Sequence, residues 1–275
     1  MRRSSTFSSA AGCGGPNRFG GSPAGRTVGA HPRTSRGPNF PRAVLFDLDD
    51  TLFDHSLTCR AALGRLRRDH AFLRRVPLDR LWREYLTALE QIHPGVLSGR
   101  WTSEEARAER FRRIGELAGR RIDPEEAAGL SQSYRSLYRT LRRPVPGARA
   151  VLERLHGRTA IGVVTNNEVA EQEEKLRFLG ISDRVDALVI SAAVGCAKPD
   201  PRIFAIALHR LGASADEAVM IGDSWTNDVE GARSASIRAI WFNRFGAPRP
   251  GPSDVMELDS FRSLPRLERV LASRP

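Results

Sequence analysis

The sequence predicts an α/β protein: a parallel sheet with helices on both faces, plus an all-helical segment inserted near its beginning. Three observations support this prediction. Short apolar runs alternate with single amphipathic segments after Pro144, residues 56–141 carry apolar residues at helical spacing, and acidic residues directly follow the first apolar run. We expect a core domain of residues 42–55 and 142–275, with residues 56–141 forming a separate helical cap domain.

The N-terminal segment differs in composition from the rest of the chain. Residues 1–41 are rich in Gly, Ser, Pro and Arg and lack apolar periodicity, which predicts a disordered basic tail. Residues 1–42 contain seven arginines and no acid, so much of the net charge of +11 lies there. We therefore expect no nucleic-acid binding by the folded part, and only weak binding through the tail. A transit peptide or a start codon placed too far upstream are alternative explanations.

The remaining composition narrows the class of protein. Three scattered cysteines are too few for a disulfide framework, which favours a cytoplasmic setting, and no apolar run approaches the roughly 20 residues of a membrane span. We expect no membrane partner, and a monomer or homodimer. Of the 43 Lys and Arg residues, only Lys175 and Lys198 are lysine. Because an ammonium and a guanidinium are not interchangeable, these two positions are of interest.

The first predicted strand starts at Ala43 and ends in acidic residues. Ala43–Phe46 has the continuous apolar character of a buried parallel strand. Asp47, Asp49 and Asp50 follow at once, and like charges crowded together are destabilising. The sequence therefore predicts a positive partner at this point, most simply a divalent cation with oxygen ligands.

Residues 56–141 predict about four helices and no strand. Ser103-Glu104-Glu105 and Asp123-Pro124-Glu125 are typical of helix starts, with a capping side chain and acids in the first turn. Some side chains here are candidates for substrate contact, although packing and solvated faces explain them more simply: Trp82, Tyr85, His93, Trp101 and the arginines of 107–113.

Strands and helices alternate in the remainder of the chain. The expected strands are Thr159–Val164, Ala187–Ile190, Ala218–Ile221 and Ile237–Phe242. The expected helices are Gly147–Leu155, Val169–Leu179, Pro201–Leu211, Asn227–Ala235 and a segment around 260–272. This order predicts a Rossmann-like parallel sheet, in which ligands bind at the carboxyl ends of the strands.

Polar residues occur where these strands end. Asp47, Asp49 and Thr51 follow the first strand, Thr165-Asn166 the second, and Asp223 and Asp228 a later one, while Lys198 lies in the loop before the Pro201 helix. Each residue alone has a simple structural explanation, such as a turn or a helix cap. Four residues near the motifs could equally serve local turns and packing: Asp50, Asp54, Ser224 and Trp225.

Taken together, these segments resemble the four motifs of the haloacid dehalogenase (HAD) superfamily. They are Asp47-x-Asp49-x-Thr51, Thr165-Asn166, Lys198-Pro199 and Gly222-Asp223-x4-Asp228. The resemblance covers residues 43 to about 245. It implies that Asp47 is a nucleophile, attacking phosphorus to form an aspartyl-phosphate, and that Asp49 is the general acid/base. Thr51 would help to orient Asp49.

The resemblance also implies a Mg²⁺ site and a phosphate site. Mg²⁺ would be held by Asp47, the backbone carbonyl of Asp49, and Asp223. Thr165, the Asn166 backbone N–H and Lys198 would bind the phosphoryl group. Asp228 would orient metal-bound water or Lys198.

The expected activity is Mg²⁺-dependent hydrolysis of a small-molecule phosphomonoester, a nucleotide or sugar phosphate. The insert position resembles helical-cap (subfamily I) members, and Val163–Asn167, Ala197–Phe204 and Met220–Ser224 look most like pyrimidine 5′-nucleotidases and N-acylneuraminate-9-phosphatases. Alternatives are a phosphoglycolate phosphatase, a sugar phosphomutase, or a non-catalytic HAD-like binding protein. Dehalogenation is disfavoured, because the superfamily's dehalogenases have no carboxylate at the position that corresponds to Asp49.

Overall fold

A parallel six-stranded sheet forms the centre of the computed structural model, which describes residues 40–97 and 99–273. The strands are β1 (Ala43–Phe46), β2 (Ala160–Thr165), β3 (Ala187–Ile190), β4 (Ala218–Gly222), β5 (Arg238–Phe242) and β6 (Met256–Leu258). Their order is β3-β2-β1-β4-β5-β6, and every neighbouring pair is parallel. The predicted Rossmann-like α/β class is confirmed.

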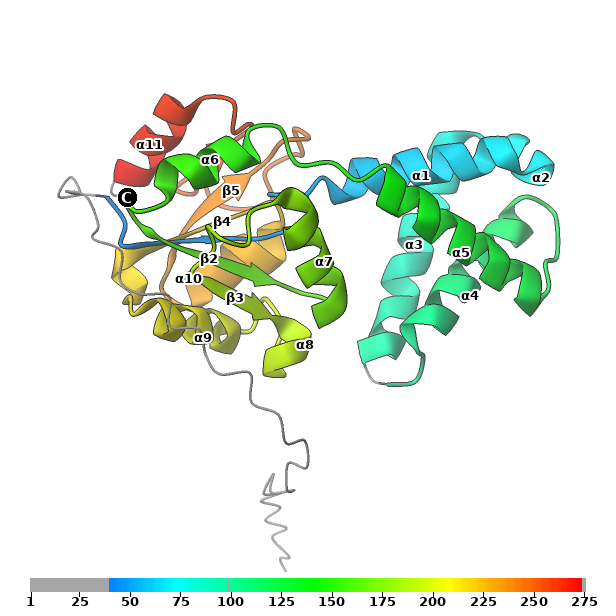
Figure 1. The fold of residues 1–275 in the computed structure, drawn as a ribbon, viewed down its shortest axis with the longest axis horizontal. Helices are drawn as coiled ribbons and strands as arrows, with labels where there is room; N and C mark the ends of the chain where they lie inside the picture. The colour runs from blue at the N-terminus through cyan, green and yellow to red at the C-terminus, as the bar shows by residue number, and fades with distance from the viewer. Residues whose placement is uncertain (1–39, 98, 274–275) are drawn as a thin grey trace, which may run out of the picture. The chain divides into compact units, whose positions relative to one another are not determined.

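Helices cover both faces of this sheet (Figure 1). One face packs on α6 (Ala148–Leu155), α7 (Val169–Leu179) and α11 (Leu264–Ala272). The other packs on α9 (Pro201–Leu211), the π-helical turn η2 (Trp225–Glu230) and α10 (Gly231–Ser234). Alternate residues of one strand enter the two clusters, so every side chain of β1 is buried. Two further short helices are α8 (Ser191–Val194) and η1 (Ala215–Glu217).

The edge strand β6 and one helix start differ from the sequence prediction, and the short helices α8 and η1 were not predicted. The short edge strand β6 was not predicted, because its three residues, Met256, Glu257 and Leu258, contain no continuous apolar run. The helix expected at Asn227–Ala235 begins at Trp225 and winds first as a π-helix before continuing as α10. π-helical turns are uncommon and frequently lie at functional sites.

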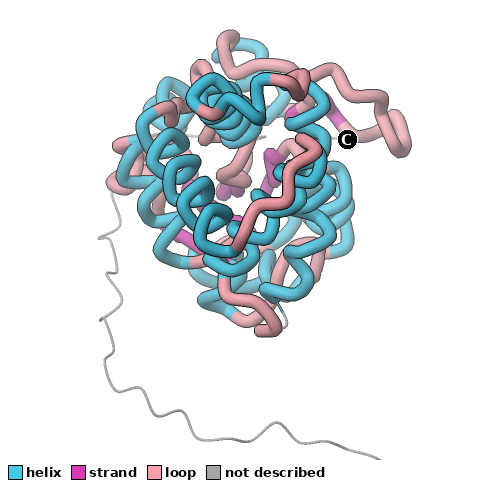
Figure 2. The backbone as a smooth tube through the Cα atoms, turned by 90° about the vertical axis from the view of Figure 1, so that its right-hand side faces the viewer, coloured by secondary structure: helices cyan, strands magenta, loops and turns pink. Residues whose placement is uncertain are grey.

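The segment between β1 and α6 is helical. It comprises α1 (His55–Asp69), α2 (Ala71–Arg74), α3 (Leu78–Leu97), α4 (Ser103–Leu117) and α5 (Pro124–Thr140). These helices share an apolar cluster of their own, running in sequence from Cys59 to Tyr134. Figure 2 shows the strands in magenta with helices around them. The boundaries 56–141 remain a prediction.

The two ends of this segment run side by side. Phe53 and Pro144 form an isolated antiparallel bridge, and the backbone N–H of Val145 donates to the Leu52 carbonyl at 2.9 Å. The α5 start expected at Asp123 is confirmed, because its side chain accepts from the Glu126 N–H. At α4 the capping residue is Thr102, one position before the expected start.

Residues 1–39 of the predicted basic tail lie outside the described residues. Within the described part of the chain, no helix combines the length and apolar character needed to cross a membrane.

Gly147 offers a test of the packing between α6 and the C-terminal segment. Its φ is +89°, and a Cβ there would lie 2.7 Å from the Phe261 carbonyl oxygen. We expect Gly147→Ala to lower the free energy of unfolding by at least about 2 kcal/mol, measured by urea denaturation. The matched control is Gly157→Ala, where φ is +75° and nothing lies within 4 Å. Equal losses in the two variants would contradict this assignment.

Candidate active site

The sheet order places the polar strand ends next to one another. β1 lies between β2 and β4, so Asp47, Thr165 and Asp223 meet at the same edge of the sheet. The order in which successive strands are added to the sheet reverses at β1. Strands β2 and β3 lie on one side of β1, and β4, β5 and β6 lie on the other. Such a reversal at the carboxyl edge is where open α/β sheets bind ligands.

Lys198 joins two of the carboxylates at this edge. Its Nζ donates to Asp47 Oδ1 and to Asp228 Oδ1, each at 2.6 Å, and the lysine is 5% exposed. Burial opposes the charge of Lys198, but Asp228 and Asp47 outweigh it and raise the pKa of this lysine. The second oxygen of Asp228 accepts from the Ser224 N–H at 2.9 Å. Asp228 is therefore bound at both oxygens, one by Lys198 and the other by the Ser224 backbone.

Residues on β4 and β5 make close contacts with Asp223 and Asp228. A Cβ on Gly222 would lie 2.3 Å from the Asp228 carboxyl group, so glycine is required for Asp228 to approach β4. The Trp241 indole N–H donates to the Asp223 carbonyl at 2.8 Å. The Thr51 hydroxyl lies 3.5 Å from Asp223 Oδ1, so its partner is Asp223 rather than Asp49.

Asp47, Asp223 and Asp228 form a compact acidic cluster, with one carboxylate oxygen from each lying within 4.8 Å of the others. Burial, opposed by Lys198, raises the pKa of Asp47 to about 7. Burial, followed by Asp47 and Asp228, raises the pKa of Asp223 well above its usual value. These oxygen-only ligands suit a hard divalent cation, whose charge would favour the ionised carboxylates.

Asp49 has different partners, although it is only two residues from Asp47. The Lys175 ammonium lies 2.8 Å from both Asp49 oxygens, and the Gln172 amide nitrogen lies 3.1 Å from Oδ2. His55 Nδ1 is 3.8 Å from Oδ1. Burial disfavours the ionised carboxylate, but Lys175 and His55 outweigh it, so the pKa of Asp49 is lowered.

Three of these residues were missed by sequence reasoning: His55, Gln172 and Lys175. Lys175 had a signal, being one of two lysines in a chain that otherwise uses arginine, but its place in the predicted helix 169–179 gave it no assigned role. Gln172 lies on the same helix, and His55 begins α1, without any pattern that distinguishes them from surface residues.

The second motif contacts Lys198 of the third motif directly and Asp49 of the first motif through Gln172. The Thr165 hydroxyl accepts from Gln172 Nε2 at 2.6 Å. The Asn166 side chain accepts from the Lys198 N–H and donates to the Lys198 carbonyl, both at 2.9 Å. The Asn166 amide, for which only a backbone role was predicted, therefore fixes the loop that carries Lys198.

The four residues near the motifs that were also considered, Asp50, Asp54, Ser224 and Trp225, make local structural contacts. The Asp50 carboxylate accepts from the Ser56 N–H near the start of α1, and Asp54 pairs with Arg143 and Arg244. Ser224 caps η2 by accepting from the Asn227 N–H, and the Trp225 ring packs edge-on against Trp241.

Most of the aromatic and basic candidates in the helical segment pack against one another. Trp82 stacks on Tyr85, and Arg110 donates to the Tyr85 hydroxyl at 3.0 Å. Arg112 and Arg113 pair with Glu109 on their own helix. These contacts fit the packing interpretation. The side chain of His93 lies outside the described residues.

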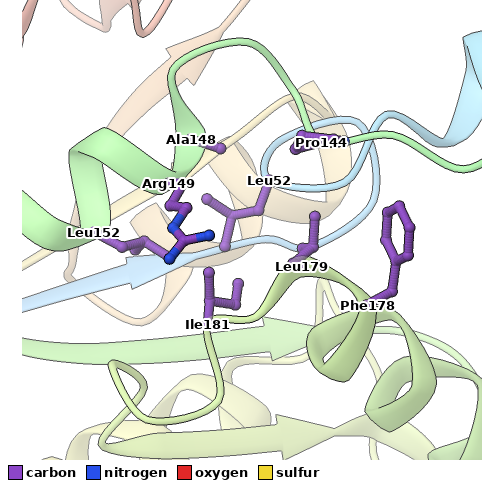
Figure 3. Close-up of a pocket in the computed structure, with 8 residues that line it drawn as sticks. All are labelled: Leu52, Pro144, Ala148, Arg149, Leu152, Phe178, Leu179 and Ile181. Atoms are coloured by element: carbon purple, nitrogen blue, oxygen red, sulfur yellow. The ribbon is translucent and has the colours of Figure 1, made fainter.

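An apolar pocket of about 220 Å³ lies near the start of α6 and the end of α7 (Figure 3). It is lined by Leu52, Pro144, Ala148, Arg149, Leu152, Phe178, Leu179 and Ile181. Arg149 is the single charged residue among them, and no motif residue contributes. This lining offers no group for phosphoryl or metal chemistry, so we do not assign the active site there.

The fold and the polar edge together define an enzyme-like α/β protein with an acidic site at the carboxyl ends of its strands. Residues 41–236 match the family model described as haloacid dehalogenase-like hydrolase. The chain belongs to this family.

Similar proteins include several phosphatases. Phosphoserine phosphatase of Thermus thermophilus is 33% identical, covering 74% of this chain and 89% of that protein. Pyrimidine 5′-nucleotidase YjjG of Escherichia coli is 28% identical, covering 83% and 96%. The magnesium-bound crystal structure of the HAD-hydrolase YfnB from Bacillus subtilis superposes with a TM-score of 0.67 at 26% identity, covering 84% and 99%. A 2-haloacid dehalogenase from Pseudomonas syringae has a TM-score of 0.56 at 29% identity, covering 84% and 99%.

The role of the Asn166 side-chain amide in holding the Lys198 loop can be tested by replacing its NH2 group with an oxygen. Asn166→Asp keeps the acceptor for the Lys198 N–H but places a carboxylate against the Lys198 carbonyl. We expect the free energy of unfolding to fall by about 1–3 kcal/mol, measured by urea denaturation at neutral pH. Stability equal to that of the wild-type protein would show that the loop is held without this amide.

Proposed function

We propose that this protein is a Mg²⁺-dependent phosphatase that hydrolyses a small-molecule alkyl phosphomonoester through a phosphoryl-Asp47 intermediate. One observation carries the proposal: two carboxylates two residues apart are bound by two different lysines, Asp47 by Lys198 and Asp49 by Lys175. Separate environments allow two chemically similar side chains to perform different tasks.

In the first step an Asp47 oxygen forms a bond to phosphorus while the bond from phosphorus to the ester oxygen breaks. The lowered pKa of Asp49 leaves it ionised in the free protein, and the negative charge of a bound ester beside it favours its protonated form. The leaving oxygen takes that proton from Asp49 and departs as the alcohol. In the second step water attacks phosphorus, its proton passes to Asp49, and the bond between Asp47 and phosphorus breaks to release inorganic phosphate.

The phosphoryl group would be bound at the same strand edge. Thr165 ends β2 next to Asp47, and the Asn166 amide holds the Lys198 loop so that the ammonium stays beside the nucleophile. A hydroxyl, a backbone N–H and an ammonium would donate to the phosphoryl oxygens, which carry the charge of the transition state.

Asp47 and Asp223 would hold Mg²⁺, with the Asp49 carbonyl as the further ligand expected from the family. When bound, the ion reduces the repulsion between the Asp47 carboxylate and the anionic ester. The acidic cluster of Asp47, Asp223 and Asp228 and its raised pKa values support a cation at this position.

Asp49 favours phosphate esters over haloacids as substrates. A halide leaves without a proton, whereas an alkoxide needs one, and Asp49 is the carboxylate able to supply it. Several relatives are named for alkyl phosphomonoesters: phosphoserine, a pyrimidine nucleotide and glyceraldehyde 3-phosphate. We propose an ester of this class, with the residues of 56–141 acting as the cap that selects it.

Asp47→Asn tests the nucleophile. An amide is a poor nucleophile towards phosphorus, so we expect kcat for p-nitrophenyl phosphate with Mg²⁺ to fall at least about 10³-fold. Asp183→Asn is the control, because Asp183 is exposed and pairs with the adjacent Arg184. The proposal fails if the wild-type protein with Mg²⁺ releases no phosphate from p-nitrophenyl phosphate or from a panel of nucleotides, sugar phosphates, phosphoserine and phosphoglycolate.

Mg²⁺ affinity should depend on pH. The pKa of Asp47 is about 7 without a metal, and Mg²⁺ binds only the ionised carboxylate. Wherever Asp47 or Asp223, whose pKa is also raised, is protonated, a proton must leave before the ion binds. The affinity therefore falls as the pH drops, by up to about tenfold per pH unit for each of the two carboxylates. Isothermal titration calorimetry with Mg²⁺ between about pH 5.5 and pH 8 measures this dependence. A constant affinity over that range would contradict the role of Asp47 as a ligand.

A further inference from the structure

The geometry points to Lys175 and Gln172 of α7 as positioning residues that hold the Asp49 carboxylate towards the oxygen of the leaving alcohol. This inference rests on the proposed phosphatase function, in which Asp49 gives that oxygen its proton. It assigns a task to Lys175, the lysine that the four family motifs do not include.

Lys175 is bound from two sides inside the protein. It is 1% exposed, and its Nζ lies 2.8 Å from each Asp49 oxygen and 3.2 Å from Glu171 Oε1. The ammonium also lies over the Phe53 ring, 5.4 Å from its centroid. A buried charge is tolerated only when it is paired, so this lysine has little freedom to turn away. The Asp49 carboxylate is held with it.

Gln172 fixes Asp49 relative to the phosphate-binding motif. It is fully buried, and its Nε2 lies 3.1 Å from Asp49 Oδ2 and 2.6 Å from the Thr165 hydroxyl. One amide group thus connects the proton donor with a residue expected to bind the phosphoryl group. In the proposed mechanism Asp49 must reach the leaving oxygen while Thr165 binds the phosphoryl group of the same substrate, so a fixed spacing between the two residues would favour the reaction.

The spacing on α7 directs the three side chains to one face. Glu171 and Lys175 are four residues apart, and Gln172 and Lys175 are three apart, both of which are neighbours on a helix. Lysine rather than arginine fits this position, because a compact ammonium can contact two carboxylates in a fully packed space. In a chain with 43 Lys and Arg residues of which two are lysine, that choice is informative.

The other groups facing Asp49 come from different elements and lie farther away. His55 of α1 is 3.8 Å from Asp49 Oδ1, and its Nδ1 is 2.9 Å from the Tyr138 hydroxyl of α5. Among the described residues, the side-chain donors within hydrogen-bond distance of the Asp49 carboxylate are therefore those of α7.

The consequence depends on the leaving group. An alkoxide is strongly basic and needs the proton from Asp49 as the bond to phosphorus breaks. p-Nitrophenolate is weakly basic and leaves without it. A misplaced Asp49 should therefore slow phosphoryl transfer from an alkyl ester much more than from p-nitrophenyl phosphate, and kcat/KM reports that first step.

The test is kcat/KM of Lys175→Met with Mg²⁺ for p-nitrophenyl phosphate and for the alkyl phosphomonoester that the wild-type protein hydrolyses fastest in the panel. We expect the alkyl ester to lose at least about tenfold more than the aryl ester, within the roughly 10²- to 10⁴-fold contribution of general acid catalysis. Equal losses for the two esters would overturn the inference, since a purely structural role affects both alike.

Two further variants keep this test decisive. Lys175→Gln retains a hydrogen-bond donor, so it remains informative if Lys175→Met does not fold, and we expect the same selective loss at smaller size. Arg142→Met is the matched control: it removes a cation that pairs with Glu174 of the same helix at 3.0 Å but does not contact Asp49. A selective loss of alkyl ester hydrolysis in this control would also overturn the inference.

The two proposals fail in different ways. A wild-type protein without Mg²⁺-dependent phosphate release contradicts the proposed function. An active wild-type protein with equal losses in the Lys175 variants contradicts only the positioning role.

Discussion

Repulsion among buried carboxylates at the end of β1 is the constraint on which the rest of the site depends. Asp47, Asp223 and Asp228 bring oxygens within 4.8 Å of one another, an arrangement that folding alone would disfavour. Lys198 offsets part of this repulsion by binding two of the three. Burial, together with the repulsion that remains, raises the pKa values of Asp47 and Asp223, and this edge is therefore a suitable place for a divalent cation.

The sheet topology creates this constraint and also supports it. Parallel strands end at one edge, so residues far apart in sequence meet beside β1. The supports are specific: the missing side chain at Gly222 admits the Asp228 carboxyl group, and the Asn166 amide holds the Lys198 backbone at two points. A site with so much like charge needs such rigid supports, because any slack would let the carboxylates separate.

These relations explain what the sequence could and could not predict. Asp47, Thr165 and Asp223 were predictable as neighbours, because the carboxyl ends of all strands in a parallel sheet lie at the same edge. The contacts of Gln172 and Lys175 were not, since they depend on how α7 is rotated against the sheet and on side-chain rotamers. The strand β6 was missed for a related reason: at a sheet edge a short strand needs little apolar sequence, and its pairing with β5 is a tertiary contact.

The two lysines give the neighbouring carboxylates Asp47 and Asp49 separate partners. Each binds one of the two carboxylates that flank Leu48, and each approaches from a different side of β1: Lys198 from the loop before α9, Lys175 from α7. If a single cation bound both, Asp47 and Asp49 would respond together to any change in charge. In the proposed mechanism, separate partners mean that the addition of a phosphoryl group to Asp47 leaves the ion pair of Asp49 intact. Asp49 can then remain in place to accept the proton of the attacking water, which is the requirement that a two-step hydrolysis imposes on its acid/base residue.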